Sequence, residues 1–87
     1  MNHNKEKNRF EEELNGQYAL IEYNFNNGVF DLYHTEVPKE LQGKGIATKL
    51  TREVLGYIKK QGYKLKPSCP FIADYITANP EYKRLIA

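Results

Sequence analysis

The strongest constraint on the fold is a change of period at Gln42–Ala47, whose sequence is QGKGIA. Before it, apolar and polar residues alternate from Tyr18 to Phe25 and again from Val29, which is typical of strands. After it, apolar residues recur at helical spacing as far as Gln61, and Gly62 follows as the expected left-handed cap. The sequence therefore predicts a sheet whose last antiparallel strand leads into one long helix.

Two Asn-Gly pairs divide the first half of the chain, because both residues tolerate the positive φ that tight hairpin turns need. Asn15-Gly16 and Asn27-Gly28 separate predicted strands at 9–14, 18–25 and 29–37. We expect a three-stranded antiparallel meander with the first strand at an edge. In the third strand, alternation places His34 on the same face as Phe30 and Leu32.

The second half of the chain predicts a parallel strand and short helices. Residues 63–66 follow the long helix, and a strand, crossover helix and strand in this order favour a parallel pair. Ser68 or Cys69 can cap a helix that runs to about residue 78, and 81–86 reads as a terminal helical turn or two. The predicted fold is α+β, with a disordered N-terminal tail at residues 1–7 and one domain at 8–87.

Length and composition limit the kinds of site. A chain of 87 residues supports a single modest core. Its lone cysteine, Cys69, excludes an internal disulfide and a cysteine-based metal cluster, and no His, Asp or Glu spacing suggests a metal site. No apolar run is long enough to span a bilayer or form a signal peptide. We expect a soluble cytoplasmic protein with no membrane partner.

The QGKGIA stretch has the features of an anion-binding loop. Gly43 and Gly45 leave backbone N–H groups uncovered at a helix start, where the helix dipole adds partial positive charge, and Lys44 adds a full charge. The alternative is that the glycines form only a tight turn. A dinucleotide-binding loop would need a third spaced glycine, and a P-loop would need Ser or Thr after the lysine, so neither motif is present.

The pattern Q-x-x-G-x-A from Gln42 to Ala47 resembles the acetyl-coenzyme A pyrophosphate loop of the GNAT acetyltransferases. With the blocks HTEVPKELQGKGIA, PSCPF and NPEYKRLI, roughly residues 17–87 are similar to the small single-domain GNAT-like family sometimes called YjdJ-type. The resemblance implies a truncated GNAT fold that binds acetyl-CoA and transfers the acetyl group to an amine, on a small molecule or a protein. It implies a pyrophosphate site made of Gln42, Gly43, Lys44, Gly45, Ile46 and Ala47.

Two further groups are expected to act on the acetyl thioester. A main-chain N–H near Val37, where the strand is disrupted before Pro38, can polarise the carbonyl. Cys69 lies at a predicted helix N-terminus, where the dipole favours the thiolate, although a single cysteine is more often a small buried hydrophobe. The family resemblance implies that Cys69 lies near the acetyl group, as a covalent acetyl carrier or as a proton donor to the leaving coenzyme A.

His34 is the candidate general base, because an amine acceptor must lose a proton before it attacks. The alternative is a histidine satisfied in the core, and Glu36 is a second candidate base. The tyrosine that many larger GNAT enzymes use as general acid has no clear counterpart here. Tyr75 and Tyr82 remain open for that role.

Two other functions fit parts of the sequence. One is a non-catalytic acyl-CoA binding module, in which His34 and Cys69 merely pack. The other is nucleic-acid binding, because residues 43–87 carry a net charge of +6 against −4 for 1–42. The basic residues concerned are Lys44, Lys49, Arg52, Lys59, Lys60, Lys64 and Lys66. A total charge of only +2 and the absence of a recognised nucleic-acid motif argue against it. We expect no nucleic-acid partner, and a monomer or weak homodimer.

Overall fold

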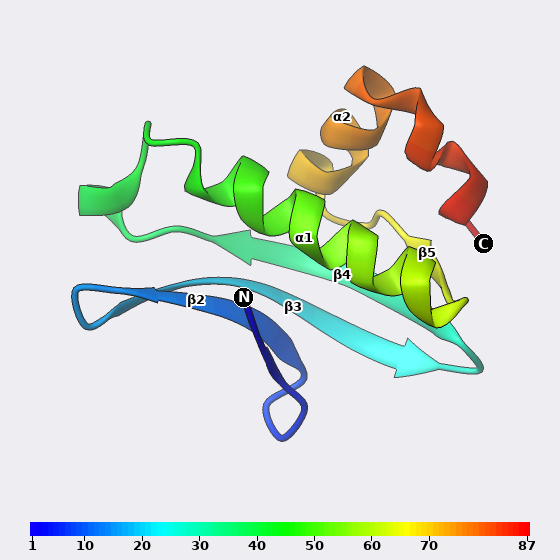
Figure 1. Ribbon diagram of the computed structural model, residues 1–87, viewed down its shortest axis with the longest axis horizontal. Coiled ribbons are helices and arrows are strands. Elements are labelled where there is room, and N and C mark those ends of the chain that lie inside the picture. The colour runs from blue at the N-terminus through cyan, green and yellow to red at the C-terminus, as the bar shows by residue number, and fades with distance from the viewer.

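A five-stranded sheet with the strand order β1-β2-β3-β4-β5 forms one layer of the molecule (Figure 1). The computed structural model describes all of residues 1–87. The first four strands are antiparallel, and β5 is parallel to β4. The strands are β1 (Asn2–Asn4), β2 (Arg9–Leu14), β3 (Gln17–Asn26), β4 (Val29–Glu36) and β5 (Lys64–Lys66). This arrangement confirms the predicted α+β fold, with an antiparallel meander and one parallel strand.

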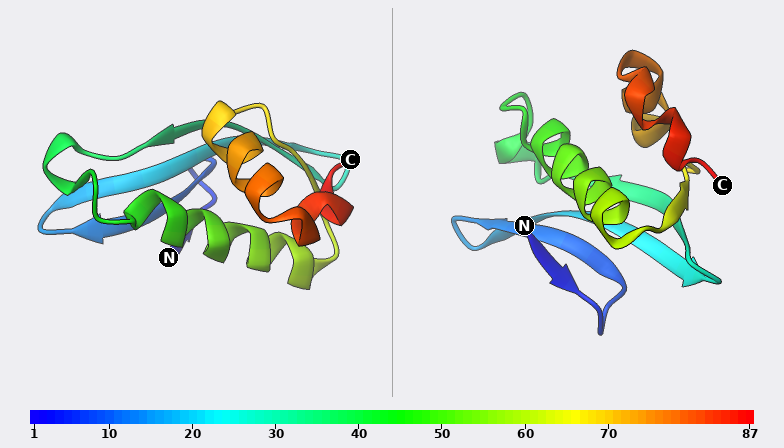
Figure 2. Two further views of the ribbon diagram at one scale, coloured as in Figure 1. Left: turned by 90° about the horizontal axis from the view of Figure 1, so that it is seen from above. Right: turned by 45° about the vertical axis from the view of Figure 1, so that its right-hand side comes forward.

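The helices form the second layer, on one side of the sheet (Figure 2). The long helix α1 (Ile46–Gln61) crosses the sheet and ends at Gly62, whose left-handed conformation is the predicted cap. The short helix α2 (Pro70–Ala78) follows, with Cys69 as its N-cap and Pro70 in its first turn. Two 3₁₀ helices, η1 (Lys39–Leu41) and η2 (Pro80–Leu85), complete the chain. No helix is both long enough and apolar enough to cross a membrane.

The two layers enclose one hydrophobic core of 15 buried residues. The face of α1 that turns to the sheet contributes Leu50, Val54, Leu55 and Ile58. Because α2 and η2 also contribute to this cluster, the C-terminal segments are part of the same core as the meander. The residues of α2 and η2 in this cluster are Ile72, Ile76 and Leu85.

The N-terminal residues differ from the predicted disordered tail at 1–7. Asn2–Asn4 form β1, which pairs with β2 and takes the edge position that the sequence assigned to residues 9–14. The His3 ring stacks on Phe10 with centroids 4.2 Å apart, and its Nε2 lies 2.7 Å from the Tyr23 hydroxyl. A short polar strand is held here because its one inward side chain contacts the core.

Because of a β-bulge in β4, His34 lies on the opposite face of the sheet from the one predicted. Glu22 pairs with His34 while the next residue, Tyr23, pairs with Leu32, so Tyr33 is the extra residue. Alternation resumes beyond it with the faces exchanged, and Thr35, paired with the buried Ile21, turns to the helix side. The prediction that His34 shares a face with Phe30 and Leu32 is therefore wrong.

Candidate functional site

The loop before α1 and the first turn of the helix present a run of unpaired backbone donors. From Gly43 to Thr48, no backbone N–H donates a hydrogen bond within the protein, and the first one that does is Lys49, to the Gly45 carbonyl. Gly43 and Gly45 have φ of 79° and 75°, a conformation that side chains rarely adopt. The two glycines therefore give this segment its shape, and the N-cap Gly45 leaves the helix start uncovered.

A cavity of about 200 Å³ lies beside these donors. It is lined by loop and helix residues from both sides of the helix start and by one residue of α2. The lining residues are Val37, Leu41, Gln42, Gly43, Gly45, Ile46, Ala47, Thr48 and Phe71. Free N–H groups at a helix N-terminus favour a negatively charged group, since they add hydrogen bonds to the positive end of the dipole. The chemistry of this cavity therefore suits an anion.

The two polar side chains predicted for the loop have different positions. Gln42 lines the cavity, but its Nε2 donates to the Val37 carbonyl at 3.1 Å and so ties the two ends of the loop together. Lys44 is exposed and lies outside the lining. Its charge can act on an anion from the solvent side. Gly43, Gly45, Ile46 and Ala47, rather than Lys44, form this wall of the cavity.

Cys69 is buried at the N-cap of α2, next to the end of β4. Its N–H donates to the Leu32 carbonyl at 2.8 Å, which fixes the start of α2 against the sheet. Its Sγ lies 3.3 Å from the Thr35 hydroxyl, which the bulge has turned to this side. The sulfur is thus held between β4 and the first turn of α2.

The surroundings of Cys69 favour its charged form. Burial alone would raise the pKa of the thiol, but the Thr35 hydroxyl and the backbone N–H groups of Ile72 and Phe71 outweigh burial, and the pKa is lowered. Neither helix N–H meets the geometry of a regular capping hydrogen bond, so their effect is that of the positive helix end. The arrangement provides a thiol that ionises more readily than a free one.

The anion cavity and Cys69 are parts of one region. Val37, two residues after Thr35, and Phe71, two residues after Cys69, both line the cavity. Within β4 only Val29–Asp31 pair with β5, so the later half of β4 has no strand beside it on that edge. The Val37 N–H also makes no backbone hydrogen bond. An extended ligand could therefore run from the cavity along this open edge toward Cys69.

His34 lies elsewhere, on the outer face of the sheet. Its Nε2 is 3.6 Å from Glu36 Oε1, and both side chains are largely exposed, at 47% and 62%. Cys69 is buried on the helix side of the same sheet. The structure therefore does not bring the two predicted catalytic residues together.

Sequence reasoning missed two residues of this region. Simple alternation predicts Thr35 on the face opposite Phe30 and Leu32, and only the bulge brings it to Cys69. Phe71 reads as an ordinary helix residue, although it is partly exposed against the cavity. The signal for Phe71 was its place in the PSCPF block; nothing in the sequence indicated the bulge.

Most of the chain matches known proteins. The family described as GCN5-related N-acetyl-transferase matches residues 9–85. Protein NATD1 of Mus musculus is 32% identical over 81 residues, which cover 90% of this chain and 74% of the relative. NATD1 of Gallus gallus is also 32% identical, and NATD1 of Danio rerio is 30% identical. Both matches cover the same fractions of this chain and of the relative. The match to the family begins at Arg9, so β1 lies outside it.

Proposed function

Because this chain belongs to the GCN5-related N-acetyltransferase family, we propose that it binds acetyl-CoA and transfers the acetyl group to an amine acceptor. The observation that carries the proposal is the run of unpaired backbone N–H groups from Gly43 to Thr48 around the anion cavity. Acetyl-CoA contains a pyrophosphate, which such a run of donors is suited to hold. Acetyl-CoA would supply an activated acetyl thioester.

The open edge of β4 offers a place for the arm between the pyrophosphate and the thioester. That arm contains amide groups, and an unpaired strand edge can exchange hydrogen bonds with amides as a neighbouring strand would. Gln42 would keep the loop closed around the pyrophosphate through its bond to the Val37 carbonyl. Lys44 would add charge from the solvent side.

Two groups would act on the thioester. The free N–H of Val37 would hydrogen-bond the carbonyl oxygen and stabilise the negative charge that develops on it. Cys69, with Thr35 beside its sulfur, would either carry the acetyl group or give a proton to the coenzyme A sulfur as it leaves. Carrying the acetyl group requires the thiolate, which the lowered pKa favours; giving a proton requires the thiol.

His34 and Glu36 would serve the acceptor. They form an exposed pair on the outer face of β4, where an amine reaching the open edge could lose a proton to either. The acceptor would then lie on the outer face and the coenzyme on the helix side. In this arrangement His34 and Cys69 need no direct contact.

His34 and Cys69 lie on opposite faces of the sheet. This separation also supports a second candidate function, that of a non-catalytic acyl-CoA binding module. A binding module needs the anion cavity and the open edge, and it makes no demand on the distance between these side chains. In this alternative Cys69 packs as a small hydrophobe, consistent with its 6% exposure.

Binding and turnover experiments separate the two. We expect calorimetry to show that acetyl-CoA binds, and an assay with pooled primary amines and peptides to show release of coenzyme A that H34A reduces. Mass spectrometry after incubation with acetyl-CoA tests whether Cys69 carries the acetyl group. Binding without release of coenzyme A under any condition would favour the binding module, and no binding would refute both.

A further inference from the structure

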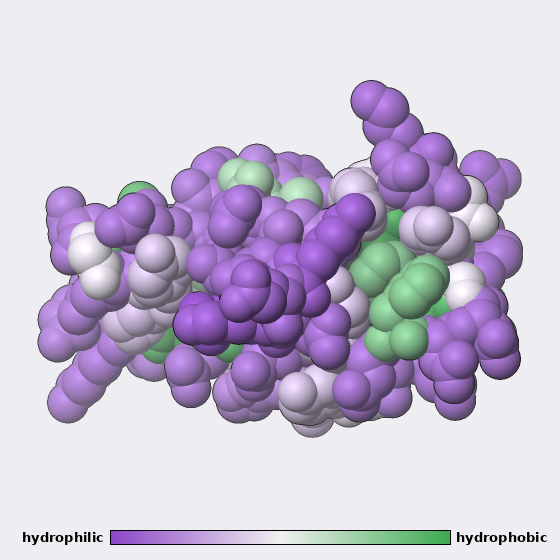
Figure 3. Space-filling view, turned by 90° about the horizontal axis from the view of Figure 1, so that it is seen from below, coloured by the Kyte–Doolittle hydropathy of each residue, from purple (hydrophilic) through white to green (hydrophobic).

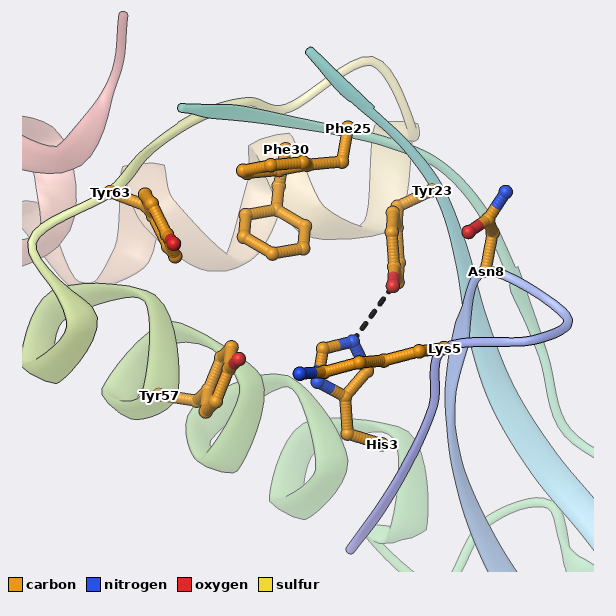
Figure 4. Close-up of a pocket in the computed structure, with 8 residues that line it drawn as sticks. All are labelled: His3, Lys5, Asn8, Tyr23, Phe25, Phe30, Tyr57 and Tyr63. Atoms are coloured by element: carbon orange, nitrogen blue, oxygen red, sulfur yellow. Dashed lines mark hydrogen bonds between the residues drawn. The ribbon is translucent and has the colours of Figure 1, made fainter. Parts of the chain in front are cut away.

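A second and larger cavity lies at the other end of the molecule. It has a volume of about 340 Å³, and six rings form its walls: Tyr23, Phe25, Phe30, Tyr57, Tyr63 and His3 (Figure 4). We call it the aromatic pocket. It shares no lining residue with the anion cavity beside α1. His3 and its neighbour in the lining, Lys5, precede the part of the chain that matches the family.

The walls of the aromatic pocket hold one another in place. Phe25 meets Tyr63 edge to face at 5.1 Å, and His3 meets Tyr57 in the same way at 5.0 Å. The rings come from β1, the β3–β4 hairpin, α1 and the residue before β5, so the tertiary fold assembles them. In the view from below, a hydrophobic patch toward the β3–β4 hairpin interrupts a mostly hydrophilic surface (Figure 3). Flat aromatic walls of this kind suit a planar ring.

The polar groups of the aromatic pocket offer several donors to an anion, one of them the Asn8 amide. Its lining contains no carboxylate, and the Lys5 ammonium makes no ion pair. The hydroxyls of Tyr57 and Tyr63 make no hydrogen bond to the protein, whereas that of Tyr23 is held by His3. The charge of Lys5 reaches the walls, since after burial it is the second cause of the lowered pKa of His3.

Aromatic walls alone would also suit an organic cation, through attraction to the ring faces. Lys5 argues against that occupant, because a second positive charge would enter a pocket without a carboxylate to balance it. The volume is near the lower end of the range for small-molecule sites. One or two fused rings would fill it.

We propose that the aromatic pocket binds a small planar aromatic carboxylate, with the ring between the aromatic walls and the carboxylate toward Lys5 and the tyrosine hydroxyls. The proposal does not depend on acetyl transfer. It assigns a second ligand site, separate from the anion cavity.

The first test compares three probes by NMR titration of the full chain. These are 2-naphthoate, 2-naphthylmethylammonium with the same rings and the opposite charge, and octanoate with the same charge and no ring. We expect 2-naphthoate to shift signals of Phe25, Tyr57 and Tyr63, and to bind about tenfold more tightly than either of the others. Equal or tighter binding of the cation, or shifts confined to other surfaces, would overturn the proposal.

The second test uses matched variants. K5Q should weaken 2-naphthoate binding about tenfold, while K59Q, which removes an exposed lysine of α1 outside the pocket, should not. F25A should weaken it as well, whereas Y33A, which removes an aromatic side chain of the same 46% exposure outside the pocket, should have no effect. Unchanged 2-naphthoate affinity in folded K5Q and F25A would refute the site. None of these measurements uses acetyl-CoA, so failure here leaves the proposed function untouched.

Discussion

Cys69 shows how one residue can combine a structural and a chemical part. Its N–H fastens α2 to β4 through the Leu32 carbonyl, and its sulfur faces Thr35. A buried cysteine in an apolar setting would be hard to ionise, yet the donors around this one reverse the effect of burial. The reversal depends on the bulge at Tyr33, because regular alternation would turn Thr35 outward.

Replacing Thr35 with valine should make Cys69 harder to ionise. The variant keeps the shape of the side chain but removes the hydroxyl that stabilises the thiolate, so the pKa of Cys69 should rise. The rate of iodoacetamide alkylation should then fall several-fold at neutral pH, and its pH profile should move upward. T77V is the control, because the Thr77 hydroxyl bonds only to the Ala73 carbonyl in α2. An unchanged profile in T35V would show that the hydroxyl does not stabilise the thiolate.

The glycine inside α1 and the glycine that caps its C-terminus have opposite roles. Gly56 lies inside the helix with ordinary helical φ, whereas Gly62 ends it with φ of 77°. A Cβ added at either position would meet no atom within 4 Å. The effect of an added methyl group on stability therefore depends on the backbone conformation at each glycine.

G56A should stabilise the protein, and G62A should destabilise it. Alanine in a helix interior is favoured over glycine by about 0.5–1 kcal/mol, and at positive φ the preference reverses by a similar amount or more. Urea denaturation of the two variants measures the free energy of unfolding. If both substitutions changed it in the same direction, α1 would not have the cap described here.

The sequence predicts the main elements well and the local exceptions poorly. Alternation, the Asn-Gly pairs and the helical spacing after Gly45 placed β2 to β5, α1 and α2 within a few residues of their bounds. Those signals are local. The bulge at Tyr33 and the strand β1 depend on contacts with residues distant in the sequence, Glu22 in one case and Tyr23 in the other. The glycines predict the free N–H groups of the loop. No local signal predicts that His34 and Cys69 lie on opposite faces of the sheet.

The N-terminal strand closes one side of the molecule's core. His3 covers Phe10, and the Met1 amino group lies 3.1 Å from Glu12 and 3.8 Å from Glu53. Those two carboxylate oxygens are buried and make no hydrogen bond, so they depend on nearby positive charge, which for Glu12 also includes Lys49 at 3.8 Å. The first residues therefore join the sheet to α1.

Removal of residues 1–5 should destabilise the fold and leave acetyl-CoA binding intact. The truncation exposes Phe10 and leaves the carboxylates of Glu12 and Glu53 without the amino group, at a cost on the order of 2 kcal/mol. Thermal unfolding should show a lower midpoint, while calorimetry at a temperature where the variant is folded should show unchanged acetyl-CoA affinity. An unchanged midpoint would instead support the disordered tail that the sequence predicted.

If the bare backbone at the start of α1 holds the pyrophosphate of acetyl-CoA, a side chain added there should block it, and a pair of variants tests this directly. Gly45 and Gly62 have nearly the same left-handed conformation at opposite ends of α1. Asparagine tolerates it, as Asn8, Asn15 and Asn27 do in this chain. G45N therefore adds a side chain at the donors, and G62N adds the same side chain at the far end.

The measurement is an NMR titration with acetyl-CoA that follows the amide signals of Gly43 to Thr48. We predict that these signals shift in the natural protein and in G62N, and that G45N binds at least about tenfold more weakly. If saturating acetyl-CoA left these amides unmoved in the natural protein, or if G45N bound as tightly as G62N, the claim would be contradicted.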